Sequence, residues 1–177
     1  FGARNWHPMS FNPQTGLAYM PVQNIPLTLM DDKGWRHNSN TPGQPMAGLG
    51  WNTANYINAE APKSLPFGRL VAWDPVKQRE VWRQEHVSPW NGGTLTTAGN
   101  LVFQGTADGR FMAFNAKNGE KLWETATGTG VVAGPATYQV DGKQYVSVAV
   151  GWGGVYGIAQ RRRRSSSPTG WARCCRA

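Results

Sequence analysis

The stretch Trp90–Trp123, WNGGTLTTAGNLVFQGTADGRFMAFNAKNGEKLW, decides the fold because turn residues divide it into short segments. Four pairs of turn residues punctuate it: Gly92-Gly93, Gly99-Asn100, Asp108-Gly109 and Asn118-Gly119. Pairs of this kind reach positive φ at little steric cost. Between them lie Leu101–Gly105 and Arg110–Asn115, which are too short and too rich in β-favouring residues for helices. The stretch therefore predicts three short strands in an antiparallel meander.

The end of this stretch repeats an earlier segment of the chain. Ala72–Trp82, AWDPVKQREVW, aligns without a gap with Ala113–Trp123, AFNAKNGEKLW. The closing Trp82 and Trp123 stand 41 positions apart, a spacing typical of one four-stranded blade of a β-propeller. Two unrelated hairpins are the alternative in a Trp-rich chain, but turn type, spacing and the closing Trp all agree. We predict an all-β fold of radially repeated blades, with both tryptophans in equivalent places between blades.

These segments resemble the quinoprotein alcohol dehydrogenases, which use pyrroloquinoline quinone (PQQ). Propellers of that family are eight-bladed and carry a tryptophan docking motif close to AxDxxTGKxxW. Ala113–Trp123 fits this motif well, whereas Ala72–Trp82 lacks its Thr-Gly. The segments GGTLTTAGNLVFQGTADG and VAVGWGG also resemble the C-terminal blades of the family. The resemblance covers residues 1–160 and implies a partial propeller of about three blades, as in a C-terminal fragment of such an enzyme.

The length of the chain and its first residue both favour a truncated protein. A chain of 177 residues is too short for a closed propeller of such blades. Its first residue is Phe, and it contains neither a signal peptide nor an apolar run of about 18 residues. We therefore expect a truncation at the N-terminus and no stable insertion into a membrane.

Residues 23–67 form a long segment without periodicity, rich in Asn, Pro, Gly, Ser and Thr. Loops of that length are uncommon in compact domains and are often functional. A disordered linker is the alternative, but scattered Trp, Met, Tyr and Ile side chains need an apolar partner. We therefore predict an ordered, lid-like loop over a binding site.

Residues 161–177, RRRRSSSPTGWARCCRA, differ abruptly from the patterned chain before them. Six arginines supply most of the net charge of +8 and leave +2 for residues 1–160, a balance that predicts no nucleic-acid partner. We interpret this basic tail as disordered or as the product of a shifted reading frame, with a basic binding arm as the alternative. We expect it to pack against nothing, because an arginine run cannot bury its charge without partners.

The resemblance also implies a set of cofactor-binding residues. In the family the quinone lies in the middle of the propeller beside a calcium ion, and the Asn-Trp pair of the family falls on Asn5 and Trp6. The amide can hydrogen-bond quinone oxygens and the indole adds an apolar wall. Trp90 matches a family tryptophan near the cofactor, and Val155 in GWGGVYG matches a residue that approaches a cofactor carboxylate. The alternative is structural, because most tryptophans of such propellers pack between blades.

Other candidate residues carry no assignment. The three histidines show no metal-ligand spacing, and the adjacent acids Asp31-Asp32 are a weak calcium signal. Vicinal cysteines over the cofactor are a family feature, but they lie well before the matched region, so Cys174-Cys175 does not inherit that role. The chain also has no CxxCH haem attachment motif. We assign no catalytic and no metal-binding residue to this chain.

The resemblance implies that the intact enzyme transfers hydride from a small alcohol to PQQ. A family aspartate takes the hydroxyl proton while calcium polarises the quinone. That aspartate and the calcium ligands belong to other blades, so we expect the chain alone to be inactive. The resemblance further implies a periplasmic location and a cytochrome c-type electron acceptor. The alternative is a non-catalytic propeller scaffold that binds other proteins, which would have no use for NWHPM, the lid or GWGG.

Overall fold

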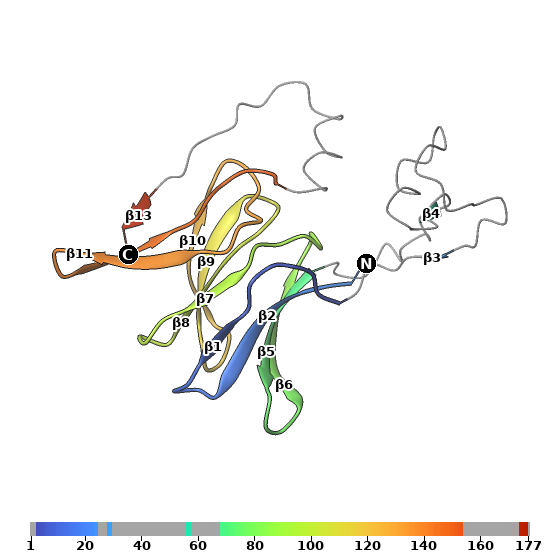
Figure 1. The fold of residues 1–177 in the computed structure, drawn as a ribbon, viewed down its shortest axis with the longest axis horizontal. Coiled ribbons are helices and arrows are strands. Elements are labelled where there is room, and N and C mark those ends of the chain that lie inside the picture. Colours follow the sequence, from blue (N-terminus) through green and yellow to red (C-terminus); the bar gives the residue numbers. More distant parts are fainter. Residues whose placement is uncertain (1–2, 25–27, 30–55, 58–67, 154–173, 177) are drawn as a thin grey trace, which may run out of the picture. The chain divides into compact units, whose positions relative to one another are not determined.

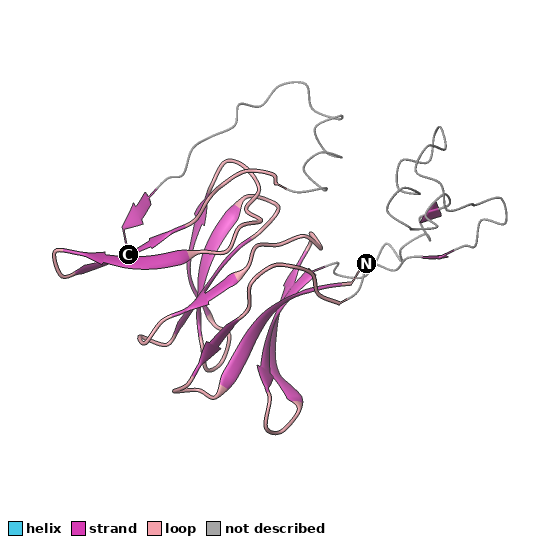
Figure 2. Ribbon diagram, viewed as in Figure 1, coloured by secondary structure: helices cyan, strands magenta, loops and turns pink. Residues whose placement is uncertain are grey.

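The structure is a computed structural model that describes residues 3–24, 28–29, 56–57, 68–153 and 174–176. These residues form strands and connecting loops without a helix (Figure 1, Figure 2). Within these ranges no helix is therefore long and apolar enough to cross a membrane. The chain divides into two compact units, one made of Phe1–Gly2 and Ile25–Leu65 and the other of the remaining residues.

The described residues of the smaller unit form one pair of short strands. β3 (Thr28–Leu29) pairs with β4 (Tyr56–Ile57) in antiparallel orientation. Most of residues 23–67 lie outside the described part of the chain, so the predicted lid remains a prediction.

The larger unit begins with a four-stranded antiparallel sheet in the order β1-β2-β5-β6. Its strands are β1 (Ser10–Asn12), β2 (Leu17–Gln23), β5 (Gly68–Asp74) and β6 (Arg79–His86). Side chains of β2 alternate between buried and partly buried positions, as expected when one face of a strand packs on a core. The first hairpin closes at Gly16, whose φ of 68° suits a residue without a Cβ.

The stretch Trp90–Trp123 folds into the second antiparallel sheet, in the order β10-β9-β8-β7. Its strands are β7 (Thr94–Thr96), β8 (Leu101–Gly105), β9 (Arg110–Asn115) and β10 (Lys121–Ala126). The predicted meander is therefore confirmed, with β8 and β9 at their predicted bounds. A fourth strand, β10, extends it, because the turn at Gly119 (φ 75°) returns the chain along β9.

The third sheet has the order β11-β12-β13. β11 (Ala136–Val140) and β12 (Lys143–Ser147) form a hairpin around Asp141-Gly142, and β13 (Cys174–Arg176) pairs with β12. The expectation that residues 161–177 pack against nothing is therefore wrong for Cys174–Arg176. The open backbone edge of β12 offers hydrogen bonds to any extended segment, whatever its charge.

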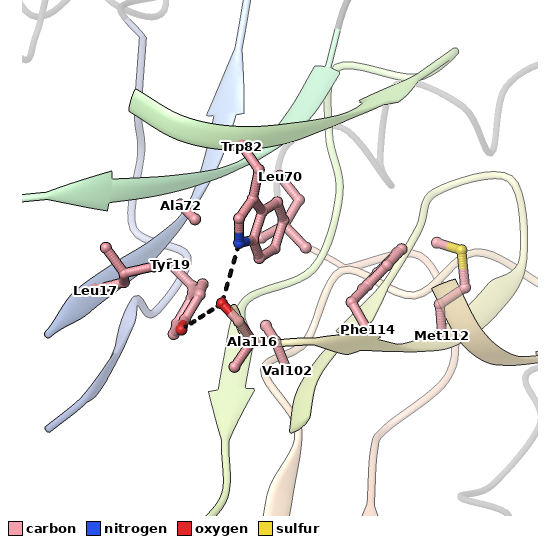
Figure 3. Packing of buried hydrophobic residues seen from close by; sticks show 9 residues of the cluster. All are labelled: Leu17, Tyr19, Leu70, Ala72, Trp82, Val102, Met112, Phe114 and Ala116. Carbon is pink, nitrogen blue, oxygen red and sulfur yellow. Dashed lines mark hydrogen bonds between the residues drawn. The ribbon is translucent and has the colours of Figure 1, made fainter. Parts of the chain in front are cut away.

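The first two sheets pack together through Trp82, which is only 9% exposed (Figure 3). Its Nε1 donates a hydrogen bond to the carbonyl oxygen of Ala116 at 3.0 Å, and the hydroxyl of Tyr19 donates to the same oxygen at 2.9 Å. The ring lies over Gly119, where an added Cβ would stand 2.6 Å from Trp82 Cε3. The docking role predicted for Trp82 is confirmed.

Trp123 does not occupy the equivalent place among the described residues. It is 40% exposed and makes an edge contact at 6.1 Å with Phe111 of its own sheet. The residue one repeat after Ala116 is Gly157, which lies outside the described part of the chain. The described residues therefore do not show Trp123 in a place equivalent to that of Trp82. The predicted all-β partial propeller is confirmed.

Candidate functional site

An aromatic cluster lies before the first strands of the first two sheets. The indole of Trp6 stacks on the imidazole of His7, with ring centroids 4.2 Å apart and an interplanar angle of 23°. On His7, Trp90 makes an edge contact at 5.3 Å and 82°. Two of the four predicted cofactor residues, Trp6 and Trp90, thus share one cluster, and both stand four positions before β1 and β7 respectively.

Hydrogen bonds between β1 and β7 hold these two entry segments together. Thr94 donates its backbone N–H to Pro8 O at 3.0 Å and its hydroxyl to Tyr19 O at 3.0 Å. Ser10 Oγ lies 2.9 Å from Thr94 Oγ1. Because the Thr94 hydroxyl proton is used on Tyr19, Ser10 is the donor in this pair. These bonds therefore hold the segment that carries Trp6 against the start of β7, four residues after Trp90.

Pro8 anchors the segment that carries Trp6. One side of its ring lies so close to Gly93 and Gly134 that a Cβ at either glycine would stand 2.3 or 2.5 Å from Pro8 Cγ. No side chain fits at either position while Pro8 stays in place. Only glycine permits this close approach.

Asn5 is exposed and its carboxamide is oriented by the backbone. Its Oδ1 accepts a hydrogen bond from Trp6 N–H at 2.9 Å. This bond occupies the acceptor end of the side chain, so the amino group with its two donors is the end presented to a partner. A donor beside an exposed indole suits a planar ligand that carries carbonyl oxygens.

The loop that carries Trp90 is fixed by Asn91, which is 3% exposed. Asn91 Nδ2 donates to Ser88 O at 2.6 Å, and its Oδ1 accepts from Ala107 N–H at 3.2 Å. Gly68 lies close to this amide, since a Cβ at Gly68 would stand 2.4 Å from Asn91 Nδ2. Trp90 itself is partly buried. The sequence reasoning missed Asn91, because an Asn next to two glycines looks like a turn residue.

A buried polar chain connects the end of β6 with the same loop. Gln104 Nε2 donates to Gly92 O at 3.0 Å, and Gln104 Oε1 lies 3.0 Å from His86 Nε2. Because the Gln104 amide uses its donor on Gly92, its oxygen must accept from His86, which fixes the Nε2–H tautomer of that imidazole. Burial lowers the pKa of His86 below its ordinary value, although the Gln104 hydrogen bond acts in the opposite direction.

His7 was not among the predicted site residues. It is 4% exposed, and its Nε2 has no hydrogen-bond partner among the described residues. Burial lowers the pKa of His7, and the nearby Arg4 guanidinium lowers it further, so the imidazole at the centre of the cluster is neutral at pH 7. Sequence spacing gave no signal for this role, because a single histidine has no periodic partner.

The remaining predictions about the site fall outside the structure or stay open. Val155 lies outside the described residues. Among the residues that were placed, no group of three or more His, Cys, Asp or Glu side chains is arranged to hold a metal ion.

The protein is a partial β-propeller in which Trp82 packs between two sheets. An aromatic cluster precedes β1 and β7, the first strands of these sheets. The sequence pattern of one family, the PQQ-dependent glucose/ethanol/alcohol dehydrogenase β-propeller domain, matches residues 1–146. The chain belongs to this family, as its docking repeat predicts.

Individual relatives agree with this assignment. A quinohemoprotein alcohol dehydrogenase of Comamonas testosteroni is 70% identical over 168 residues, which are 95% of this chain and 24% of the relative. A crystal structure of quinohemoprotein alcohol dehydrogenase from that organism matches with a TM-score of 0.78 at 72% identity, covering 89% of this chain and 23% of that one. A 1-butanol dehydrogenase (cytochrome c) of Thauera butanivorans is 65% identical over 164 residues, 93% of this chain and 24% of the relative.

A europium-containing methanol dehydrogenase shares the fold at a TM-score of 0.68 and 30% identity, covering 92% of this chain and 27% of that structure. The chain thus spans about a quarter of the length of the relatives it matches, 24% for the first two. The Comamonas match takes in 95% of the chain, so it continues past residue 160 into the tail for which the sequence analysis found no resemblance.

Proposed function

We propose that this chain supplies part of the PQQ site of a quinoprotein alcohol dehydrogenase, with Asn5, Trp6, Trp90 and Val155 facing the cofactor. The observation that carries the proposal is the cluster in which Trp6 and Trp90 meet across His7. Packing alone gives no reason to leave an indole 57% exposed on top of a buried imidazole, whereas a flat ligand gains an apolar wall from it.

The residues present fit a planar quinone with polar edges. Trp6 offers a flat face, and the oriented carboxamide of Asn5 offers two donors beside it. The Arg4 guanidinium, which donates to His7 O at 3.0 Å, adds positive charge beside the cluster and would attract cofactor carboxylates.

Each residue of the site has a separate task. Asn5 would bind and orient a quinone oxygen, while Trp6 and Trp90 would limit the positions of the ring and exclude water from its faces. When bound, PQQ supplies the acceptor for the hydride of the alcohol. We place the base that takes the hydroxyl proton and the calcium ligands outside this chain, in the portion of the relatives that it does not cover.

The intact enzyme would then oxidise a small alcohol and pass electrons to a cytochrome c-type acceptor in the periplasm. The name of the Thauera relative, 1-butanol dehydrogenase (cytochrome c), supports this substrate class and this acceptor. The scaffold alternative gains no support, because the relatives described above are dehydrogenases.

The test grafts this chain in place of the matching quarter of the Comamonas enzyme, so that every blade is present. We expect the graft to bind PQQ and to oxidise a primary alcohol. Asn5→Ala should weaken PQQ binding by about 1 to 3 kcal/mol, because a polar cofactor oxygen loses its donor. Trp6→Ala should also weaken binding, whereas the matched control Trp123→Ala should not. Unchanged PQQ affinity in both site variants would refute the assignment.

A further inference from the structure

His7 is the best-buried member of the cluster, and no role for it follows from the docking repeat. Only 4% of its surface is exposed, and its Nε2 has no hydrogen-bond partner among the described residues. Buried polar atoms are nearly always paired. A buried imidazole with an unpaired nitrogen therefore needs a reason that a Leu or Val at the same place would not satisfy.

The contacts of His7 supply such a reason. One face of the imidazole carries the Trp6 indole at 4.2 Å, and Trp90 meets the imidazole edge-on at 5.3 Å. Stacked and edge contacts both depend on the charge distribution of flat rings, which aliphatic side chains lack. In the described part of the chain, His7 provides the one ring contact of Trp6, whose own surface is 57% exposed.

His7 is itself held firmly by its neighbours. Its carbonyl oxygen accepts from Arg4 Nη2 at 3.0 Å. The next residue, Pro8, accepts from Thr94 N–H and packs against Gly93 and Gly134. The backbone that carries the imidazole is therefore attached to the first strand of the second sheet, and the ring contacts Trp90, which precedes that strand.

We propose that His7 is a positioning residue that holds the plane of the Trp6 indole and its angle to Trp90. This inference rests on the proposed function, because it assumes that Trp6 is a wall of the quinone site. Because only 4% of the His7 surface is exposed, we assign the imidazole a supporting role and not a direct contact with the cofactor. Its neutral, flat ring is the support that keeps an exposed indole in one orientation before the cofactor arrives, which reduces the ordering cost of binding.

The first readout uses the full 177-residue chain without cofactor. The near-UV circular dichroism difference between wild type and Trp6→Phe reports how well the Trp6 indole is ordered. We expect this difference to vanish in the His7→Leu background and to persist in the His7→Phe background, because Phe preserves a flat ring. Acrylamide quenching of fluorescence should rise in His7→Leu for the same reason. Persistence of the difference in His7→Leu would overturn the proposal.

The second readout is PQQ affinity in the graft described above. His7→Leu should weaken PQQ binding about threefold to tenfold, the equivalent of one lost aromatic contact, and His7→Phe should restore most of it. If His7→Phe is as weak as His7→Leu, the imidazole nitrogens matter rather than the flat ring, and the proposal is wrong.

The same two readouts separate this inference from the proposed function. If Trp6→Ala leaves PQQ affinity unchanged, the proposed function fails, whatever the His7 variants do. If Trp6→Ala weakens binding and His7→Leu does not, only the positioning role fails. Should His7→Leu not fold, His7→Phe decides the matter, because loss of the ordered Trp6 signal in that folded variant would refute a role for the flat ring.

Discussion

Trp82 and Tyr19 donate to one carbonyl oxygen, that of Ala116, and this arrangement predicts that their removal is not additive. Trp82→Phe and Tyr19→Phe each delete one donor to Ala116 and keep an aromatic ring. Each variant can therefore still form an aromatic contact between positions 19 and 82, where the ring centroids are 5.7 Å apart. After either single change the buried carbonyl still has one hydrogen bond. After both changes it has lost the two donors that the structure gives it.

The expected magnitudes follow from these contacts. Tyr19→Phe removes the hydrogen bond to Ala116 and a second one with Thr15 Oγ1 at 2.8 Å. At about 0.5 to 1.5 kcal/mol for each bond, we expect a loss of about 1 to 3 kcal/mol. Trp82→Phe also loses ring area from a side chain that is 9% exposed, so we expect about 1 to 3 kcal/mol. The double variant should lose about 1 kcal/mol more than the sum, because a buried acceptor without a donor carries its own penalty.

The assay is urea denaturation followed by far-UV circular dichroism, since fluorescence would change with the number of tryptophans. The free energy of unfolding is compared at constant m-value, so that changes in the denatured state are recognised. Val76→Ala, at an 87% exposed position, serves as a control and should stay within about 0.5 kcal/mol of wild type. Strict additivity of the two changes would refute the shared-acceptor argument.

Three further predictions follow from single contacts. Gly119→Ala and Gly142→Ala both place a Cβ at positive φ, 75° and 73°, but only at Gly119 would this atom strike the Trp82 ring, at 2.6 Å. Gly119→Ala should therefore destabilise the chain by more than the about 1 to 2 kcal/mol of backbone strain expected for Gly142→Ala; equal urea midpoints would contradict this. Because the pKa of buried His86 is lowered from 6.5, the unfolded chain takes up the proton first. The contribution of His86 to the free energy of unfolding should be fully present above pH 6.5 and should be lost as the pH decreases below that value. His86→Gln should reduce this dependence of the urea midpoint on pH, while His7, whose pKa is also lowered, keeps a part of it; the same pH dependence in both proteins would speak against His86. Asn91→Ala should cost about 1 to 3 kcal/mol, because the Ala107 N–H loses its buried acceptor, and an unchanged thermal midpoint would show that water replaces the amide.

The sequence predicted those parts of the fold in which local turn chemistry and spacing agree. The bounds of β8 and β9 were predicted correctly because pairs of turn residues follow each strand where the backbone needs positive φ. β10 was not predicted as a strand, since the polar and apolar residues of its sequence KLWETA do not alternate. β13 was not predicted either, because its pairing with β12 depends on an open backbone edge and not on its own composition.

The site was predicted from the resemblance rather than from local pattern. Trp6 and Trp90 were named on that basis, and the structure brings them to one cluster, while their role in binding remains a proposal. His7 was set aside because the histidines show no metal-ligand spacing. Its burial was not predicted, because it arises from contacts with segments far along the chain, such as Pro8 against Gly93 and Gly134. Contacts of this kind leave no periodic signal in a single sequence.

The turn at Asn118-Gly119 constrains the evolution of the sequence. The same glycine reverses the chain between β9 and β10 and forms the floor on which a tryptophan of the neighbouring sheet rests. A larger residue at Gly119 can be accommodated only if a smaller side chain replaces Trp82. We therefore expect these two positions to covary. Neighbouring blades therefore cannot diverge freely, even where each one would fold correctly by itself.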